Sequence, residues 1–200
     1  MSAQWLTCLV FLLLYVAVES DVDCKASRHQ ATSLAASCCQ LLRPSLDKGV
    51  AECRATLSLP QRKFKLMEQY TINACIEECR FMDRGFIPID PPFELDMSNI
   101  RTSLEATMPA PQEEAVSFML SAFTKCAKFY EKHKTRFSSQ LPAVDFIEEE
   151  CNVFPLHLTI CMRVHGMQKC PKTFYADTSE CDMARKYFTQ CVGDIEAGAQ

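Results

Sequence analysis

Glycine is scarce in this chain, and the patterns typical of β-strands, glycoproteins and common hydrolases are missing. Only five glycines occur in 200 residues, and no stretch alternates apolar and polar side chains as a half-buried strand does. No Asn-x-Ser/Thr sequon is present, so N-glycosylation is not expected. No Gly-x-Ser-x-Gly nucleophile elbow occurs either. These absences favour a helical protein without a recognisable catalytic nucleophile.

The longest apolar run lies near the N-terminus and is short for a membrane span. Trp5–Val18 is a run of 14 mainly apolar residues, whereas a transmembrane helix needs about 20. Val18 and Ser20 are small enough for the positions before a cleavage site, which predicts a signal peptide over 1–20 and a single domain over 21–200. A membrane anchor is the alternative, because no basic residue precedes the run. We expect a secreted, extracellular protein with no stable membrane insertion.

Cysteine is abundant, and its count predicts a disulfide framework. The chain has 13 cysteines, of which Cys8 lies in the predicted leader and twelve remain. An even number in an oxidising compartment indicates six disulfides. Adjacent Cys38 and Cys39 are expected to take separate partners. The mild net charge of −4 offers no global field for nucleic acid, so no nucleic-acid partner is predicted.

Helical periodicity dominates the rest of the chain. Helices are expected over about 27–42, 46–56, 60–83, 112–136 and 155–169. Two capping pairs, Thr102 with Glu105 and Asp177 with Glu180, predict further helix starts. The helix over 60–83 is expected to bury Phe64, Met67, Thr71, Cys75, Cys79 and Met82, and that over 155–169 to bury Leu156, Ile160, Val164 and Met167. Three prolines between Gly85 and Glu94 predict a non-helical segment.

The spacing of the later cysteines resembles a known family. Cys53, Cys75-x3-Cys79, Cys126 and Cys161-x8-Cys170 resemble the six-cysteine pattern of insect odorant-binding proteins. The additional Cys151, Pro171 directly after Cys170, and Cys181 resemble the Plus-C subgroup typical of mosquitoes. The resemblance covers most of the chain after the leader. It implies an all-α bundle of about six to eight helices, cross-linked by disulfides, that encloses an apolar cavity.

The resemblance also implies three of the bridges. These are Cys53 with Cys79, Cys75 with Cys161, and Cys126 with Cys170, where Cys126 is chosen over Cys151 as the fourth cysteine because it lies on the long amphipathic helix. Sequence leaves the partners of the other six open: Cys24, Cys38, Cys39, Cys151, Cys181 and Cys191. Extensions over 21–52 and 171–200 are expected to carry extra disulfides.

By the same resemblance, the protein is expected to carry small hydrophobic odorants or semiochemicals through sensillum lymph to receptors. No cofactor, metal or catalytic residue is implied, and either a monomer or a homodimer is compatible. Apolar residues compatible with a deformable pocket are Phe118, Met119, Phe123, Tyr130, Met162, Met167, Phe174 and Tyr187. Periodicity alone favours a core position for each, so the pocket assignment depends on the resemblance.

Three other functions compete with the carrier: a zinc site, a lipid-acting hydrolase, and a structural or defensive protein. His157, Cys161 and His165 share a helix face that could hold zinc, but Cys161 is needed for a disulfide. The Cys38-Cys39 pair is similar to secreted phospholipases, yet Leu42 stands where their catalytic histidine would be. A secreted lipid-acting hydrolase and a structural or defensive protein with a filled core therefore stay as alternatives. Histidine titration could also couple pH to ligand release.

Overall fold

All regular secondary structure that we describe is helical. The computed structural model describes residues 22–137, 141–147 and 150–193, so the leader predicted over 1–20 lies outside the described residues. Within these ranges the one β-type contact is an isolated antiparallel bridge between Cys39 and Tyr175. The helices are α2 (Cys24–Cys38), α3 (Leu42–Leu46), α4 (Val50–Thr56), α5 (Leu66–Asp83), α6 (Met97–Thr107), α7 (Gln112–Phe137), α8 (Phe154–Lys169), the short 3-10 helix η1 (Lys172–Phe174) and α9 (Ser179–Gln190). The predicted all-α class is confirmed.

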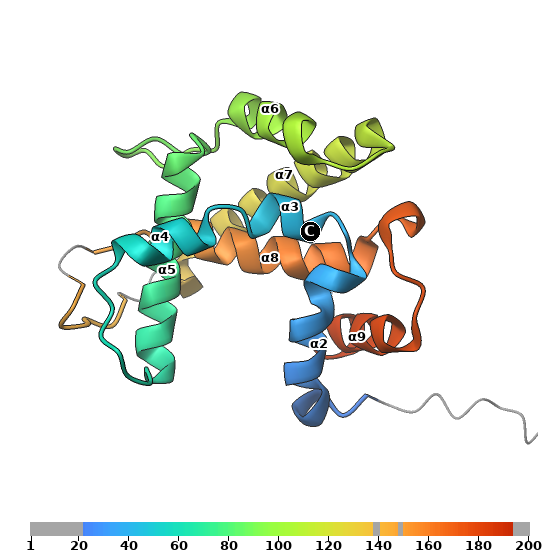
Figure 1. The fold of residues 1–200 in the computed structure, drawn as a ribbon, viewed down its shortest axis with the longest axis horizontal. Helices are drawn as coiled ribbons and strands as arrows, with labels where there is room; N and C mark the ends of the chain where they lie inside the picture. The colour runs from blue at the N-terminus through green and yellow to red at the C-terminus, as the bar shows by residue number, and fades with distance from the viewer. Residues whose placement is uncertain (1–21, 138–140, 148–149, 194–200) are drawn as a thin grey trace, which may run out of the picture.

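Helix α8 lies at the centre of the molecule. Helix α5 crosses one end of it, α7 runs along it, and α2 and α9 lie side by side at the other end (Figure 1). Most of the α8 side chains are buried, from Phe154 at its start to Met167 near its end. Ile160, which we predicted to be buried, is 46% exposed, and its neighbours one turn away on the same side, His157 and Arg163, are only partly buried.

Helices α7 and α8 begin and end within one residue of their predicted bounds, whereas the earlier helices differ more. Helix α2 covers 24–38 rather than 27–42, and the helix predicted over 46–56 is α4 over 50–56, preceded by the separate α3 over 42–46.

Helix α5 starts at Leu66 rather than near residue 60. The backbone N–H of Lys65 donates to the Glu68 carboxylate at 2.7 Å, and Arg62 pairs with the same carboxylate at 2.7 Å. These contacts fix the first turn of the helix. Met67 in that turn is 55% exposed and not buried as predicted, because the turn projects beyond α8.

Two helix caps differ from those predicted. Helix α6 begins at Met97, where the Asp96 carboxylate accepts from the backbone of Ser98 and Asn99 at 2.9 Å. Thr102 therefore lies inside this helix. Helix α9 is capped by Thr178, whose hydroxyl accepts from the Cys181 N–H at 3.2 Å. Both true caps place a short oxygen-bearing side chain where it satisfies helix N–H groups that have no carbonyl partner.

Six disulfides cross-link these helices. Three of them join the N-terminal part of the chain to its C-terminal part, and we call this set the terminal clamp: Cys24–Cys191, Cys38–Cys181 and Cys39–Cys170. The others are Cys53–Cys79, Cys75–Cys151 and Cys126–Cys161. Adjacent Cys38 and Cys39 take separate partners, as expected. The predicted Cys53–Cys79 bridge is confirmed.

The predicted pairs Cys75–Cys161 and Cys126–Cys170 are wrong. Helix α7 packs against α8 so that the Cα atoms of Cys126 and Cys161 are 5.7 Å apart. Cys170 lies a further nine residues along, about 13 Å at 1.5 Å per residue, and disulfides require Cα atoms within about 7 Å. Cys75 faces the segment before α8, where the Cα atom of Cys151 is 5.1 Å away. Cys170 is thereby left for Cys39.

Peptide mapping of the oxidised protein should give this connectivity. Digestion without reduction by a glutamate-specific protease and chymotrypsin separates Cys75 from Cys79 and Cys151 from Cys161. Mass spectrometry is then expected to find one fragment pair joined through Cys75 and Cys151, and another through Cys126 and Cys161. A fragment joining Cys75 to Cys161 would contradict the helix packing described above.

Candidate functional site

The residues predicted to line a pocket lie in or against the main hydrophobic core. Phe118 and Tyr130 are partly buried, and the others are buried: Met119, Phe123, Met162, Met167, Phe174 and Tyr187. Phe123 packs its ring against Phe86, with centroids 5.8 Å apart, and Phe118 stacks on His165 at 5.5 Å. The two surface depressions described below have other linings, so an internal pocket formed by these residues stays a prediction.

A groove lies where α7 passes the start of α8 and the segment before α6, and we call it the α7 groove. Its volume is about 500 Å³, within the usual range for small-molecule sites. Its lining is mainly apolar, with a few polar side chains. The lining residues are Pro92, Phe93, Glu94, Leu95, Met97, Thr124, Ala127, Lys128, Glu131 and Phe154.

One wall of the groove is the proline-rich segment that the sequence predicted to be non-helical. The backbone N–H of Asp96 donates to the Phe86 carbonyl at 2.8 Å, and the Asn99 side-chain amide donates to the Gly85 carbonyl at 3.1 Å. Phe86 itself is buried against Phe81, with ring centroids 5.7 Å apart. The wall is thus tied to the end of α5 and held beside α7.

The floor of the groove is Phe154, the first residue of α8. Its backbone N–H donates to the Asn152 side chain at 2.8 Å, which fixes the start of the helix. The ring of Phe154 lies 4.9 Å from that of Tyr130 on α7. Tyr130, a predicted pocket residue that packs against the core, therefore also contacts the lining of the groove.

Behind the floor lies a Tyr–His pair. The Tyr70 hydroxyl and the His157 Nε2 are 2.7 Å apart, and the rings of Tyr130 and His157 lie 5.9 Å apart. Burial lowers the pKa of His157 below its ordinary value and raises the pKa of Tyr70 and of Tyr130. All three groups are therefore uncharged at neutral pH, and the groove has a neutral aromatic backing.

The polar groups of the groove are exposed side chains along α7 and the wall. Glu131 pairs with Lys134 at 2.8 Å, and the Thr124 hydroxyl donates to the Leu120 carbonyl at 3.0 Å. Lys128 and Glu94 are exposed. This arrangement suits an elongated apolar molecule that buries its hydrocarbon part and leaves a polar end near water.

The second depression is more polar and lies between α6 and α7. It has a volume of about 520 Å³. Charged or amide side chains supply much of its lining, which consists of Arg101, Glu105, Gln112, Glu113, Val116, Ser117 and Leu120. Arg101 and Glu105 neutralise one another at 3.7 Å. The depression therefore offers neither an apolar floor nor a concentrated charge for a ligand.

In the part of the chain that the structure describes, the one group with the spacing of metal ligands is built on cysteines that are already bonded to each other. The sulfurs of Cys53 and Cys79 and the carboxylate of Asp83 lie within 4.8 Å of one another, but the two sulfurs form a disulfide. Cys161, which shares with His157 and His165 the helix face considered for zinc, is bonded to Cys126. Neither group supplies a thiolate, the form of cysteine that binds metal.

Comparison of the chain with protein-family models, with curated proteins and with solved structures found no match. Over the described residues, no helix has the length and apolar character required to cross a bilayer. The α7 groove was not predicted as a site from the sequence. The sequence feature that could have pointed to the groove is the proline-rich segment at Pro91–Pro92. Nothing in the sequence showed that this segment lies against α7 and Phe154.

Proposed function

We propose that this protein is a secreted, non-enzymatic carrier of small hydrophobic molecules, which it takes up in the α7 groove. The observation that carries the proposal is the apolar, half-open cavity of about 500 Å³ at Phe93, Leu95 and Phe154. Transfer of apolar ligand surface from water into such a site contributes about 25 cal/mol per Å² buried, before the entropic terms of binding are subtracted.

Two further observations support this proposal. Six disulfides hold the helices together, as expected of a small protein that works in an oxidising extracellular fluid. The cysteine spacing resembles that of insect odorant-binding proteins of the Plus-C subgroup, which makes volatile odorants or semiochemicals the first ligands to test. Delivery through sensillum lymph to a membrane receptor is the physiological role that follows from this resemblance.

Displacement of a fluorescent apolar probe tests the proposal. N-phenyl-1-naphthylamine is titrated into the purified protein and then displaced with a panel of C6–C12 alcohols, aldehydes and esters. We expect saturable probe binding at micromolar concentration and competition by some members of the panel. Absence of displacement across the panel would favour the structural or defensive alternative. Release of alcohol from the esters would favour the hydrolase.

Filling the groove should abolish this binding. The change Ala127→Trp places an indole ring in the groove from its α7 side, so probe affinity should fall at least tenfold. Ser121→Trp is the matched control, because Ser121 is exposed on the same helix and does not line the groove. Equal probe affinities in the two variants would place the ligand elsewhere, with the predicted core pocket as the next candidate.

A further inference from the structure

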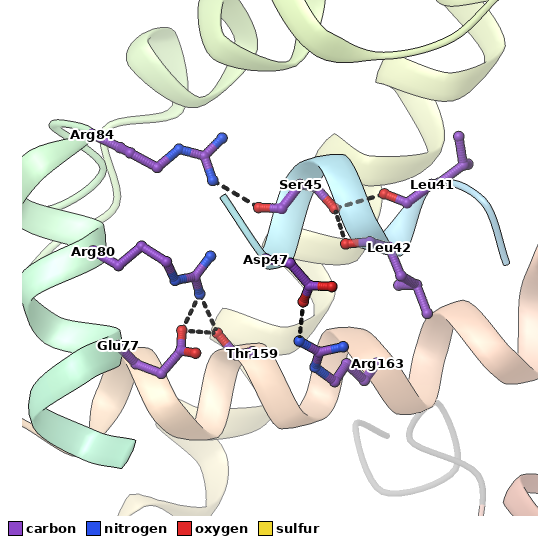
Figure 2. Close-up of polar contacts among 9 residues, drawn as sticks. All are labelled: Leu41, Leu42, Ser45, Asp47, Glu77, Arg80, Arg84, Thr159 and Arg163. Atoms are coloured by element: carbon purple, nitrogen blue, oxygen red, sulfur yellow. Dashed lines mark hydrogen bonds and ion pairs between the residues drawn. The ribbon is translucent and has the colours of Figure 1, made fainter. Parts of the chain in front are cut away.

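A buried cation lies at the contact between α5 and α8, outside the α7 groove. The side chain of Arg80 is 0% exposed. Its Nη2 donates to the carboxylate of Glu77 and, at 3.0 Å, to the hydroxyl of Thr159 on α8. The Thr159 hydroxyl in turn donates to Glu77 at 2.8 Å. Figure 2 shows these three side chains meeting on one side of the guanidinium.

On the other side of this guanidinium, two N–H groups have no acceptor among the described residues. Nε and Nη1 of Arg80 are buried and make no hydrogen bond to any described protein atom, although the guanidinium carbon lies 5.1 Å from the centre of the Phe81 ring. In Figure 2, Nη1 points away from the Glu77 carboxylate. A buried N–H group of a charged side chain without an acceptor is strongly unfavourable. The unpaired side of Arg80 therefore requires an acceptor that the protein itself does not supply.

A second arginine adds to the positive charge. Arg84 lies one turn further along α5 and donates to the Ser45 carbonyl at 2.7 Å and to the Ser103 hydroxyl at 2.8 Å (Figure 2). Both of these acceptors are neutral. Burial, together with the charge of Arg80, lowers the pKa of Arg84 to about 10. Arg84 is still protonated at neutral pH, so it and Arg80 share only one negative partner, Glu77.

The side chains of Asp47 and Asp83 make their polar contacts with other groups and not with Arg80 or Arg84. Asp47, at the end of α3, pairs with Arg163 at 2.5 Å (Figure 2), so that pair cancels its own charge. Asp83 is exposed and lies beside the sulfurs of Cys53 and Cys79. Counted by their direct partners, Glu77, Arg80 and Arg84 together thus carry a net charge of +1 in a largely buried place.

We propose that a small inorganic anion of the size of chloride binds at the unpaired side of Arg80, where α5, α8 and the α3–α4 turn meet. The anion accepts from Nε and Nη1 and cancels the excess charge that Arg80 and Arg84 create. Its site is enclosed, because the whole Arg80 side chain is inaccessible to solvent. The anion acts as a structural ligand, so binding stabilises the folded protein.

Unfolding measured in different salts tests this proposal. Thermal unfolding is followed in mixtures of sodium chloride and sodium gluconate at constant ionic strength, so that screening is unchanged. We expect the midpoint to rise with chloride and to saturate. At ten times the Kd the ratio of folded to unfolded protein rises about 11-fold, which corresponds to a shift of about 3–6 °C in the midpoint for a chain of this size.

Two variants and one diffraction experiment complete the test. Arg80→Met should lose the chloride dependence, whereas Arg101→Met, which changes an arginine that is 59% exposed, should keep it. Crystals of the unmodified protein soaked in bromide should show an anomalous peak within hydrogen-bonding distance of Arg80 Nε, whether or not Arg80→Met folds. A water molecule at that position, or a chloride effect that Arg80→Met retains, would overturn the proposal.

Discussion

Glu77→Ala is expected to lower the free energy of unfolding by about 3–5 kcal/mol, the usual effect of removing one partner of a buried ion pair. The Glu77 side chain is 10% exposed and accepts from both Arg80 and Thr159. Without it, Arg80 keeps its charge in an enclosed place and loses the carboxylate with which it pairs among the described residues. The alanine also leaves Thr159 without its acceptor, which adds to the loss.

Urea unfolding with the disulfides intact measures this effect. The midpoint should fall strongly for Glu77→Ala and much less for Glu77→Gln, which keeps an acceptor for Arg80. Glu105→Ala is the control, because Glu105 is 53% exposed and pairs with an exposed Arg101. Exposed pairs contribute about 0–1 kcal/mol. If Glu77→Ala were no more destabilising than Glu105→Ala, the buried network would have no structural importance.

The second large effect concerns the two inner bridges of the terminal clamp, Cys38–Cys181 and Cys39–Cys170. With one of them present, the other closes a loop of only about a dozen residues, for which the chain-entropy model gives about 3 kcal/mol. Without both, only Cys24–Cys191 joins the two ends of the chain. Replacing all four inner cysteines with alanine should therefore destabilise the protein by about 6 kcal/mol.

A loss of that size is comparable to the whole net stability of a typical domain. The four-alanine variant should unfold at much lower urea, or fail to accumulate as a secreted protein. The control is Cys24→Ala with Cys191→Ala, because Cys24 is exposed and its removal leaves no cavity in the core. The inner cysteines are buried, so their removal adds a packing defect. Equal midpoints for the two variants would show that the two inner bridges together stabilise the protein no more than the outer one does.

Helix periodicity in the sequence was sufficient to find the framework of the fold. Helices α7 and α8 lie within one residue of their predicted bounds at each end, because both carry long runs of apolar residues at steps of three and four. The short helices were less well placed. Their true caps, Asp96 and Thr178, stand only a few residues from other polar residues that are equally good candidates in sequence.

Disulfide pairing could not be obtained from the sequence, because it depends on where helices cross. Cys161 and Cys170 both lie on or directly after α8, and only the crossing point of α7 decides which of them Cys126 reaches. The candidate site also depends on how helices pack, and so it could not be obtained from the sequence either. The residues of the α7 groove come from the wall before α6, from α7 and from Phe154, and no local pattern links these three segments.

The buried arginine was also hidden from sequence analysis. Arg80 stands near the end of α5, where a basic residue normally faces water and complements the helix dipole. It is buried because α8 packs against α5 and Gly49, between α3 and α4, lies against its side chain, on the face of α5 that also buries Ile72 and Ile76. The sequence around Arg80 therefore did not indicate that its side chain is buried.

The outer bridge of the terminal clamp turns the chain into a covalent ring. Cys24 and Cys191 are separated by 167 positions along the chain, so nearly the whole described protein lies between two residues that are bonded to each other. A protease that cuts one peptide bond anywhere inside this ring cannot release a fragment, and the cut molecule keeps its mass apart from one added water. In an extracellular fluid rich in proteases, a single nick would thus leave all helices attached to one another.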